Sequence, residues 1–173
     1  MKTYIGIDNG LDGGIVALSP HGPIIKKWVM PTLKVIQPAR KKTKEKILRE
    51  VDASSFLAII DSLGDREKIH VIFEHCPFHA DRAATMRSMA MSSGKLLGVM
   101  ETRDIMVERV LSYDWQPLIL GKVPQGQTKS HATAKAQELW PDESWLKSSR
   151  SRIPHDGMID AALIAEYARR NDL

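Results

Sequence analysis

Ile5-Gly6-Ile7-Asp8-Asn9-Gly10 is the stretch that decides the fold, because it ends a strand-like run in an acid and a turn. Residues Thr3 to Ile7 are branched or aromatic and alternate weakly, as strand residues do. Asp12-Gly13-Gly14 adds further turn-formers before a second apolar run, Ile15 to Leu18. This order predicts a β-hairpin at the start of the chain.

The segments after this hairpin predict a mixed sheet with helices. Ile24 to Met30 is a third strand that Pro31 closes, so three antiparallel strands open the chain. A later apolar run, Ile69 to Phe73, is typical of a buried parallel strand and ends at Glu74. The remaining pattern predicts helices at 81–100, 127–139 and 156–170 and a strand at 105–111. The order βββαβαβαα indicates one α/β domain spanning residues 1–173.

A helical stripe is also expected between Thr43 and Gly64. Its apolar members recur at helical spacing, with a break near Asp52 where a cap could start a new turn: Ile47, Val51, Phe56, Ile59, Ile60 and Leu63.

The composition indicates an intracellular protein and is compatible with a polyanionic partner. No apolar run is long enough for a membrane span, and Met1 to Ile5 lead directly into a strand, so we expect no signal peptide and a cytoplasmic location in a bacterial or phage-infected host cell. Cys76 is alone, which excludes an internal disulfide framework. The net charge is only +4, but one run is densely basic, and it fits a phosphate-binding surface and a solvated helix face equally well: Arg40, Lys41, Lys42, Lys44, Lys46 and Arg49.

Four acids form a candidate metal site. Asp8 and Glu74 each follow a strand, where open α/β sheets place their ligands. Asp156 and Asp160 share one helix face, and that face continues into inward-facing apolar residues. A buried acid without a basic partner carries a large desolvation cost, which a divalent cation would offset.

Carboxylate oxygens favour magnesium, for which manganese can substitute, over zinc. Two such ions in one site suit in-line hydrolysis of a phosphodiester, so the sequence predicts a nuclease. The alternatives are that Asp8 is only a turn residue and that Asp156 is only the N-cap of the last helix. Asp12 lies between turn residues and is interpreted as structural.

Three segments resemble, in order and spacing, the acidic motifs of RuvC-type Holliday junction resolvases, especially the phage and poxvirus-like branch. They are Ile5 to Gly10, Val71 to Glu74 and His155 to Leu163. The resemblance implies a ribonuclease H-like fold and a homodimer that makes paired symmetric nicks in four-way DNA junctions, with roles in DNA recombination and repair. Asp8, Glu74 and Asp160 match the three firmest ligand positions of the family.

The fourth ligand differs from many members, which carry Asp or His where Gly157 stands here. The phage-like pattern offers Asp156, with His155 beside it as a further contact or an alternative ligand. In the family, an aromatic residue after the glutamate motif can unstack bases at the crossover. Phe78 is the candidate, and an ordinary loop anchor is its other interpretation.

Basic residues around the acids are candidate DNA contacts, and so is the start of the basic run: Lys122, Lys129, Lys147, Arg150, Arg152 and His155, with Arg40, Lys41 and Lys42. His75, Cys76 and His79 lie close in sequence but lack the second ligand pair of a zinc site. A stretch rich in Met and Ala, from Ala83 to Met100, is interpreted as core packing or as the helix of a dimer.

Three other functions compete with junction resolution. A monomeric ribonuclease H-type nuclease would act on flaps or RNA:DNA hybrids. A sugar-kinase or actin-like ATPase would need two such domains, for which 173 residues are too few. A non-catalytic DNA-binding module would have little reason to keep all four acids.

Overall fold

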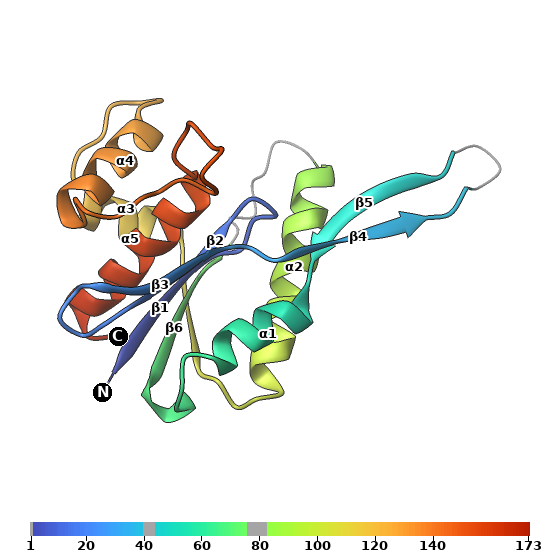
Figure 1. The fold of residues 1–173 in the computed structure, drawn as a ribbon, viewed down its shortest axis with the longest axis horizontal. Helices are drawn as coiled ribbons and strands as arrows, with labels where there is room; N and C mark the ends of the chain where they lie inside the picture. Colours follow the sequence, from blue (N-terminus) through green and yellow to red (C-terminus); the bar gives the residue numbers. More distant parts are fainter. Residues whose placement is uncertain (1, 40–43, 76–82) are drawn as a thin grey trace.

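The computed structural model describes residues 2–39, 44–75 and 83–173 of the chain. These residues form a five-stranded mixed sheet with helices on both faces (Figure 1). The strand order is β3-β2-β1-β6-β7, which places β1 in the centre. The predicted α/β class with a mixed sheet is confirmed.

The sheet is antiparallel on one side of β1 and parallel on the other. β1 (Thr3–Asp8) pairs antiparallel with β2 (Gly14–Leu18), and β2 pairs antiparallel with β3 (Ile24–Val29). On its other side β1 pairs in parallel with β6 (Ile69–Glu74), which pairs in parallel with β7 (Val107–Val110). Because β1 and β6 are parallel neighbours, their carboxyl ends, Asp8 and Glu74, lie at the same edge of the sheet.

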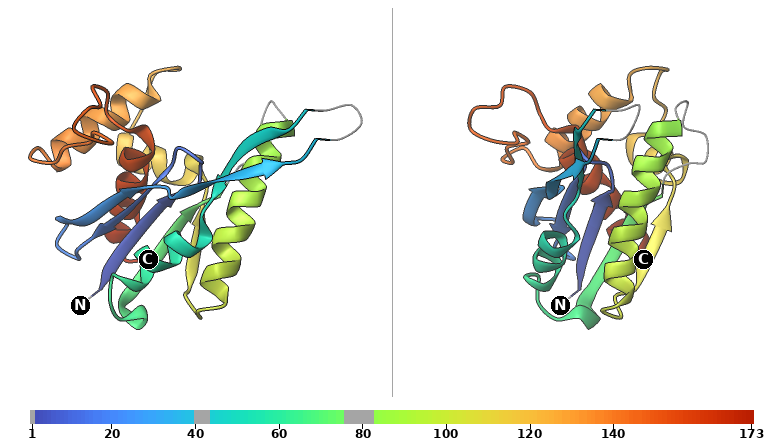
Figure 2. Two further views of the ribbon diagram at one scale, coloured as in Figure 1. Left: turned by 45° about the vertical axis from the view of Figure 1, so that its right-hand side comes forward. Right: turned by 90° about the vertical axis from the view of Figure 1, so that its right-hand side faces the viewer.

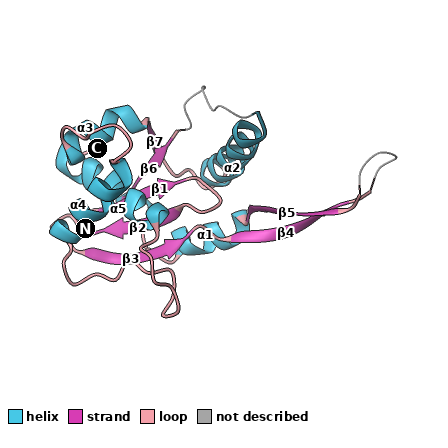
Figure 3. Ribbon diagram, turned by 90° about the horizontal axis from the view of Figure 1, so that it is seen from above, coloured by secondary structure: helices cyan, strands magenta, loops and turns pink. Residues whose placement is uncertain are grey.

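Two apolar cores fill the two faces of the sheet, because successive strand side chains alternate between the faces. On one face Ile5, Ile7 and Phe73 pack with α1 (Ala53–Asp61) and α2 (Ala83–Glu101). The opposite face packs against three helices, α3 (Ser112–Leu120), α4 (Thr128–Leu139) and α5 (Asp156–Asn171). Viewed from above, the sheet separates these two helical layers (Figure 3).

Helix α5 lies directly on the central strands because glycines leave room for it. A Cβ added at Gly6 would come within 2.0 Å of the Ala161 carbonyl oxygen of α5. A Cβ at Gly157, at the start of α5, would come within 2.4 Å of the Asp12 carbonyl oxygen. These close approaches fix the first turns of α5 beside the end of β1.

The helix expected over the first half of the apolar stripe is wrong, because residues 46–51 form a strand. β4 (Thr32–Gln37) and β5 (Lys46–Val51) form an antiparallel ribbon that projects from the body (Figure 2). The spacing of Ile47 and Val51 fits a helix, but both residues pair with residues of β4 across the ribbon. The second half of the predicted stripe is helical, as α1, and Asp52 caps its start through the backbone N–H groups of Ser54 and Ser55.

Helix α3 was not expected from the sequence, since Pro117 lies inside it. The other expected elements are present within a few residues of their predicted ends, as α2, β7, α4 and α5. None of the helices formed by the described residues is both long and apolar enough to cross a membrane.

Candidate active site

The candidate active site lies where the carboxyl ends of β1 and β6 meet the first turns of α5. Asp8 is the last residue of β1 and Glu74 the last of β6. Asp156 is the first residue of α5, and Asp160 follows one turn later. Residues from three distant parts of the chain therefore surround one edge of the sheet.

Glycine contacts bring the helix to the strand. Gly13, in the loop after Asp8, forms a parallel bridge with Gly157. A side chain at position 157 would overlap the backbone of Gly13. An acid at Gly157 is thus sterically excluded in this chain, and Asp156 is the acid nearest to that position.

Burial and mutual repulsion act on the acids together. Burial raises the pKa of Asp160 to about 8, with further contributions from the charges of Asp8, Glu74 and Asp156. Burial also raises the pKa of Glu74 to about 7, and the Asp8 charge adds to this. Such coupling requires the carboxylates to lie within electrostatic reach of one another.

Asp8 is held by its own turn. Its Oδ1 accepts a hydrogen bond of 3.1 Å from the backbone N–H of Gly10, which lowers its pKa. Burial has the larger effect, so the pKa of Asp8 is raised overall, with contributions from the charges of Asp12 and Asp156. The turn therefore orients the carboxylate without neutralising it.

The three inner acids form no ion pair with the basic residues that the structure describes. Among the residues that the structure describes, no Lys or Arg lies within ion-pair distance of Asp8, Glu74 or Asp160. Lys129, in the first turn of α4, instead donates to Asp156 Oδ2 at 2.5 Å. Both side chains of that pair are well exposed, so it contributes about 1 kcal/mol or less.

Trp115 is a contact of the site that sequence reasoning did not single out. Its side chain is fully buried in α3, and its indole N–H donates to Glu74 Oε1 at 3.0 Å. This bond lowers the pKa of Glu74 against the effect of burial.

His155, and not Asp156, is the N-cap of α5. Its Nδ1 accepts a hydrogen bond of 3.2 Å from the backbone N–H of Met158. Burial lowers the pKa of His155, and the nearby charge of Lys147 lowers it further. One nitrogen of the neutral ring therefore caps the helix. The N-cap role that was the alternative interpretation of Asp156 belongs to His155.

Asp12 is structural, in agreement with its interpretation from the sequence. Its Oδ1 accepts from Arg49 of β5 at 2.7 Å, and this hydrogen bond lowers the pKa of Asp12. The same guanidinium donates to the carbonyl oxygen of Leu11. The loop that follows Asp8 is therefore fixed to the root of the β4–β5 ribbon.

The remaining predicted DNA contacts are spread around this edge or lie outside the described residues. Lys122 is exposed in the loop between α3 and α4. Arg150 and Arg152 are exposed in the loop that leads into α5. Arg40, Lys41, Lys42 and Phe78 lie outside the described residues, as do Cys76 and His79 of the zinc alternative.

The donor chemistry of the site fits a divalent ion, although a complete ligand cage is not present. Carboxylate oxygens are the ligands that magnesium and manganese prefer. Within the described ranges, no group of three Asp, Glu, His or Cys side chains is close enough to hold one ion together. Burial and neighbouring carboxylates raise the pKa values of Glu74 and Asp160, and a bound cation would lower both.

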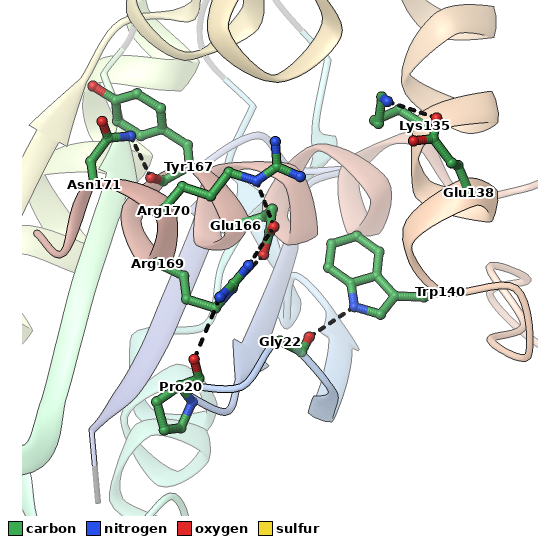
Figure 4. Close-up of polar contacts among 10 residues, drawn as sticks. All are labelled: Pro20, Gly22, Lys135, Glu138, Trp140, Glu166, Tyr167, Arg169, Arg170 and Asn171. Atoms are coloured by element: carbon green, nitrogen blue, oxygen red, sulfur yellow. Dashed lines mark hydrogen bonds and ion pairs between the residues drawn. The ribbon is translucent and has the colours of Figure 1, made fainter.

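A further acid of α5, Glu166, shows how the chain treats a buried carboxylate that has a structural role. Only 2% of Glu166 is exposed, and Arg169 donates to both of its oxygens at 2.7 and 2.8 Å. Arg170 adds a bond of 2.7 Å (Figure 4). Burial would raise the pKa of Glu166, but these hydrogen bonds outweigh it and hold the pKa below its ordinary value.

Comparison with solved structures identifies the fold class as RuvC-like, within the ribonuclease H-like α/β folds. RuvC from Thermus thermophilus in complex with a Holliday junction substrate is similar, with a TM-score of 0.58 and 11% sequence identity over 98% of this chain and 96% of that one. A second Thermus thermophilus RuvC structure matches with a TM-score of 0.54 at the same identity and coverage.

Sequence comparisons do not assign the chain to a particular protein family. No protein-family model matches the chain, and no curated protein matches it either. At 11% identity the structural likeness shows the fold alone. The phage and poxvirus-like branch stays a prediction.

Proposed function

We propose that this chain, as a single catalytic domain of residues 1–173, is a magnesium-dependent endonuclease that resolves four-way DNA junctions. The observation that carries the proposal is the group of acids at the end of β1, with raised pKa values and no arginine or lysine on its three inner members within the described residues. A RuvC-like fold provides the setting, since one similar structure is a RuvC bound to a Holliday junction.

Asp8, Glu74, Asp156 and Asp160 would hold the ions. Two magnesium ions, or manganese in their place, would activate a water and stabilise the departing oxygen of the phosphodiester. Asp8 is oriented by the Gly10 N–H and Glu74 by the Trp115 indole, so both carboxylates are positioned before any ion binds. Asp160 approaches from the helix, and its protonation at neutral pH makes metal affinity increase with pH.

Lys129 is the cation best placed to meet the scissile phosphate. It lies 2.5 Å from Asp156, and its ammonium feels the charge of Asp160 as well. Because both partners are exposed, the ion pair is weak enough for Lys129 to exchange Asp156 for a phosphate oxygen. Lys122, Arg150, Arg152, His155 and the basic run at Arg40 to Lys42 would contact other phosphates, and Phe78 would contact bases near the crossover.

A homodimer would place two such sites on one junction and account for paired symmetric nicks. Ala90 and Gly94 of α2 are exposed and Gly98 is half-buried, and added Cβ atoms at the two glycines would meet nothing within 4 Å, which allows close approach of a second helix. This supports α2 as the helix of the dimer.

Cleavage of labelled four-way junction, linear duplex and RNA:DNA hybrid, with magnesium or with a chelator, tests the proposal. Junction resolution predicts paired nicks in the four-way junction that require magnesium. Preferential cutting of the hybrid or of a flap would instead indicate another ribonuclease H-like nuclease. Binding of the junction without any cleavage would indicate a non-catalytic DNA-binding module.

A further inference from the structure

The β4–β5 ribbon carries an apolar pair that the fold does not use. Ile36 and Ile47 face each other across the two strands and are 63% and 67% exposed. A two-stranded ribbon has little stability of its own, so two large exposed apolar side chains on it point to a partner. Figures 1 to 3 show that the ribbon extends well beyond the body of the molecule.

Among the described residues, the other face of the ribbon contacts the body only near its root. Leu33 and Glu50 form one cross-strand pair of that face, and Val35 and Leu48 form the next. Glu50 makes an ion pair with Lys95 of α2, which holds this face toward the body. Leu33 and Leu48 on that face are 39% exposed, so Ile36 and Ile47 are the most exposed apolar side chains of β4 and β5.

The positive charge of the ribbon favours a polyanionic partner. Lys34, Lys44 and Lys46 are exposed, and none of them has a carboxylate within ion-pair distance among the residues described here. Lys34 lies directly beside the apolar pair on the same face, opposite Arg49. A second copy of the chain docked on this face would bring these like charges together, which is unfavourable.

The root of the ribbon is tied to the candidate active site. Arg49 binds Asp12 and the Leu11 carbonyl in the loop that immediately follows Asp8. The backbone N–H of Met30, just before β4, donates to the Gly13 carbonyl at 2.9 Å. A strand of six residues spans about 20 Å, so a DNA segment bound along the ribbon can continue to its root beside the loop that follows Asp8.

We propose that the β4–β5 ribbon is a DNA-binding arm whose Ile36–Ile47 pair packs against an unstacked base at the branch point. Lys34, on the same face, and Lys46, next to Ile47 in β5 but on the opposite face, bind phosphates on the two sides of the ribbon. This inference rests on the proposed function. Apolar side chains flanked by cations are a common means of holding an opened base step. The arm is a contact additional to that of Phe78, from a different part of the chain.

The test uses the cleavage-deficient variant Asp160→Asn as parent, with four-way junctions carrying 2-aminopurine at the branch or within one arm. The double substitution Ile36→Thr, Ile47→Thr keeps β-branched residues and removes the apolar pair. We expect junction affinity to fall by about tenfold, duplex affinity to change by less than about twofold, and the branch-point fluorescence increase to be lost. Ile25→Thr, at a 52% exposed position of β3, is the matched control and should change none of these.

A second variant keeps the proposal testable if the first folds poorly. Lys34→Gln, Lys46→Gln should reduce the slope of log affinity against log salt by about 2, since each lost phosphate contact lowers it by about 0.9.

Several outcomes would contradict the proposal that the ribbon is a DNA-binding arm. They are an unchanged junction affinity in the threonine variant, loss of the fluorescence change only in Phe78→Ala, or a shift from dimer to monomer caused by the threonine pair without DNA. If the parent itself binds junction and duplex equally, the proposed function fails, whatever the arm does.

Discussion

Two buried acids on the same helix show opposite electrostatic solutions. Glu166 is surrounded by the guanidinium groups of Arg169 and Arg170, and its pKa is lowered. Asp160, less than two turns earlier, meets the charges of Asp8, Glu74 and Asp156, and its pKa is raised to about 8. The chain can neutralise a buried carboxylate where stability requires it, so the uncompensated acids at the other end of α5 indicate a role that needs their charge available.

The largest expected effect is on cleavage. Asp160→Asn or Glu74→Gln should reduce junction cutting by at least about a hundredfold, because each removes a ligand oxygen that only the reaction needs. Junction binding should stay within about threefold of the wild type, since the phosphate contacts are intact. Glu166→Gln is the control, and its folded fraction should cut normally. If Asp160→Asn cut the junction at the wild-type rate, Asp160 would not be a metal ligand and would not differ in role from Glu166.

Asp160→Asn and Glu166→Gln should have opposite effects on the free energy of unfolding. In chelator at pH 8.5, Asp160→Asn should raise the free energy of unfolding by on the order of 1 kcal/mol, because it relieves repulsion and desolvation. Glu166→Gln should lower it by about 1–3 kcal/mol, because it loses charge-assisted hydrogen bonds. Urea unfolding followed by circular dichroism measures both. Destabilisation by both substitutions would mean that Asp160 is as well compensated as Glu166.

Trp115→Phe tests whether the indole positions Glu74. The ring is kept and the hydrogen bond to Oε1 is lost, so half-maximal cleavage should need roughly tenfold more magnesium, with the rate at saturating metal little changed. Trp140→Phe is the matched control, since it loses a comparable bond of 2.9 Å to the Gly22 carbonyl far from the acids. An equal shift in both variants would point to general loosening of the fold.

The smallest effect is the pH dependence of the metal-free protein. The folded pKa values of Glu74 and Asp160, about 7 and about 8, lie above those of the unfolded chain. The folded state therefore binds more protons between about pH 4 and pH 8, and stability falls as pH rises through this range. The thermal midpoint in chelator should decline accordingly, and magnesium should restore it more at pH 8 than at pH 5. A midpoint that rises with pH would contradict these values, and Asp160→Asn should flatten the decline.

The central strands and the acids could be predicted from sequence because local signals agree there. Strand periodicity, turn residues and the acid at each strand end all indicate the same edge of the sheet, and β1, β2, β3 and β6 are where they were expected. Four-residue spacing was enough to place Asp156 and Asp160 one turn apart on α5.

The rest depended on contacts that no local pattern reveals. Residues 46–51 have helical spacing but pair with β4, a partner that was not expected as a strand. Trp115 reaches Glu74 across 41 positions of the chain. The cap of α5 is His155 because the backbone N–H of Met158 reaches its ring, which residue preferences for caps do not favour.

Calorimetric titration of the DNA-free protein with manganese at pH 8 tests the central claim most directly. If the acids at the end of β1 form a metal site, the wild type and Glu166→Gln should show saturable binding with release of protons, and Asp160→Asn should bind at least about tenfold more weakly. Equal binding by Asp160→Asn and the wild type, or no binding by either, would contradict the account.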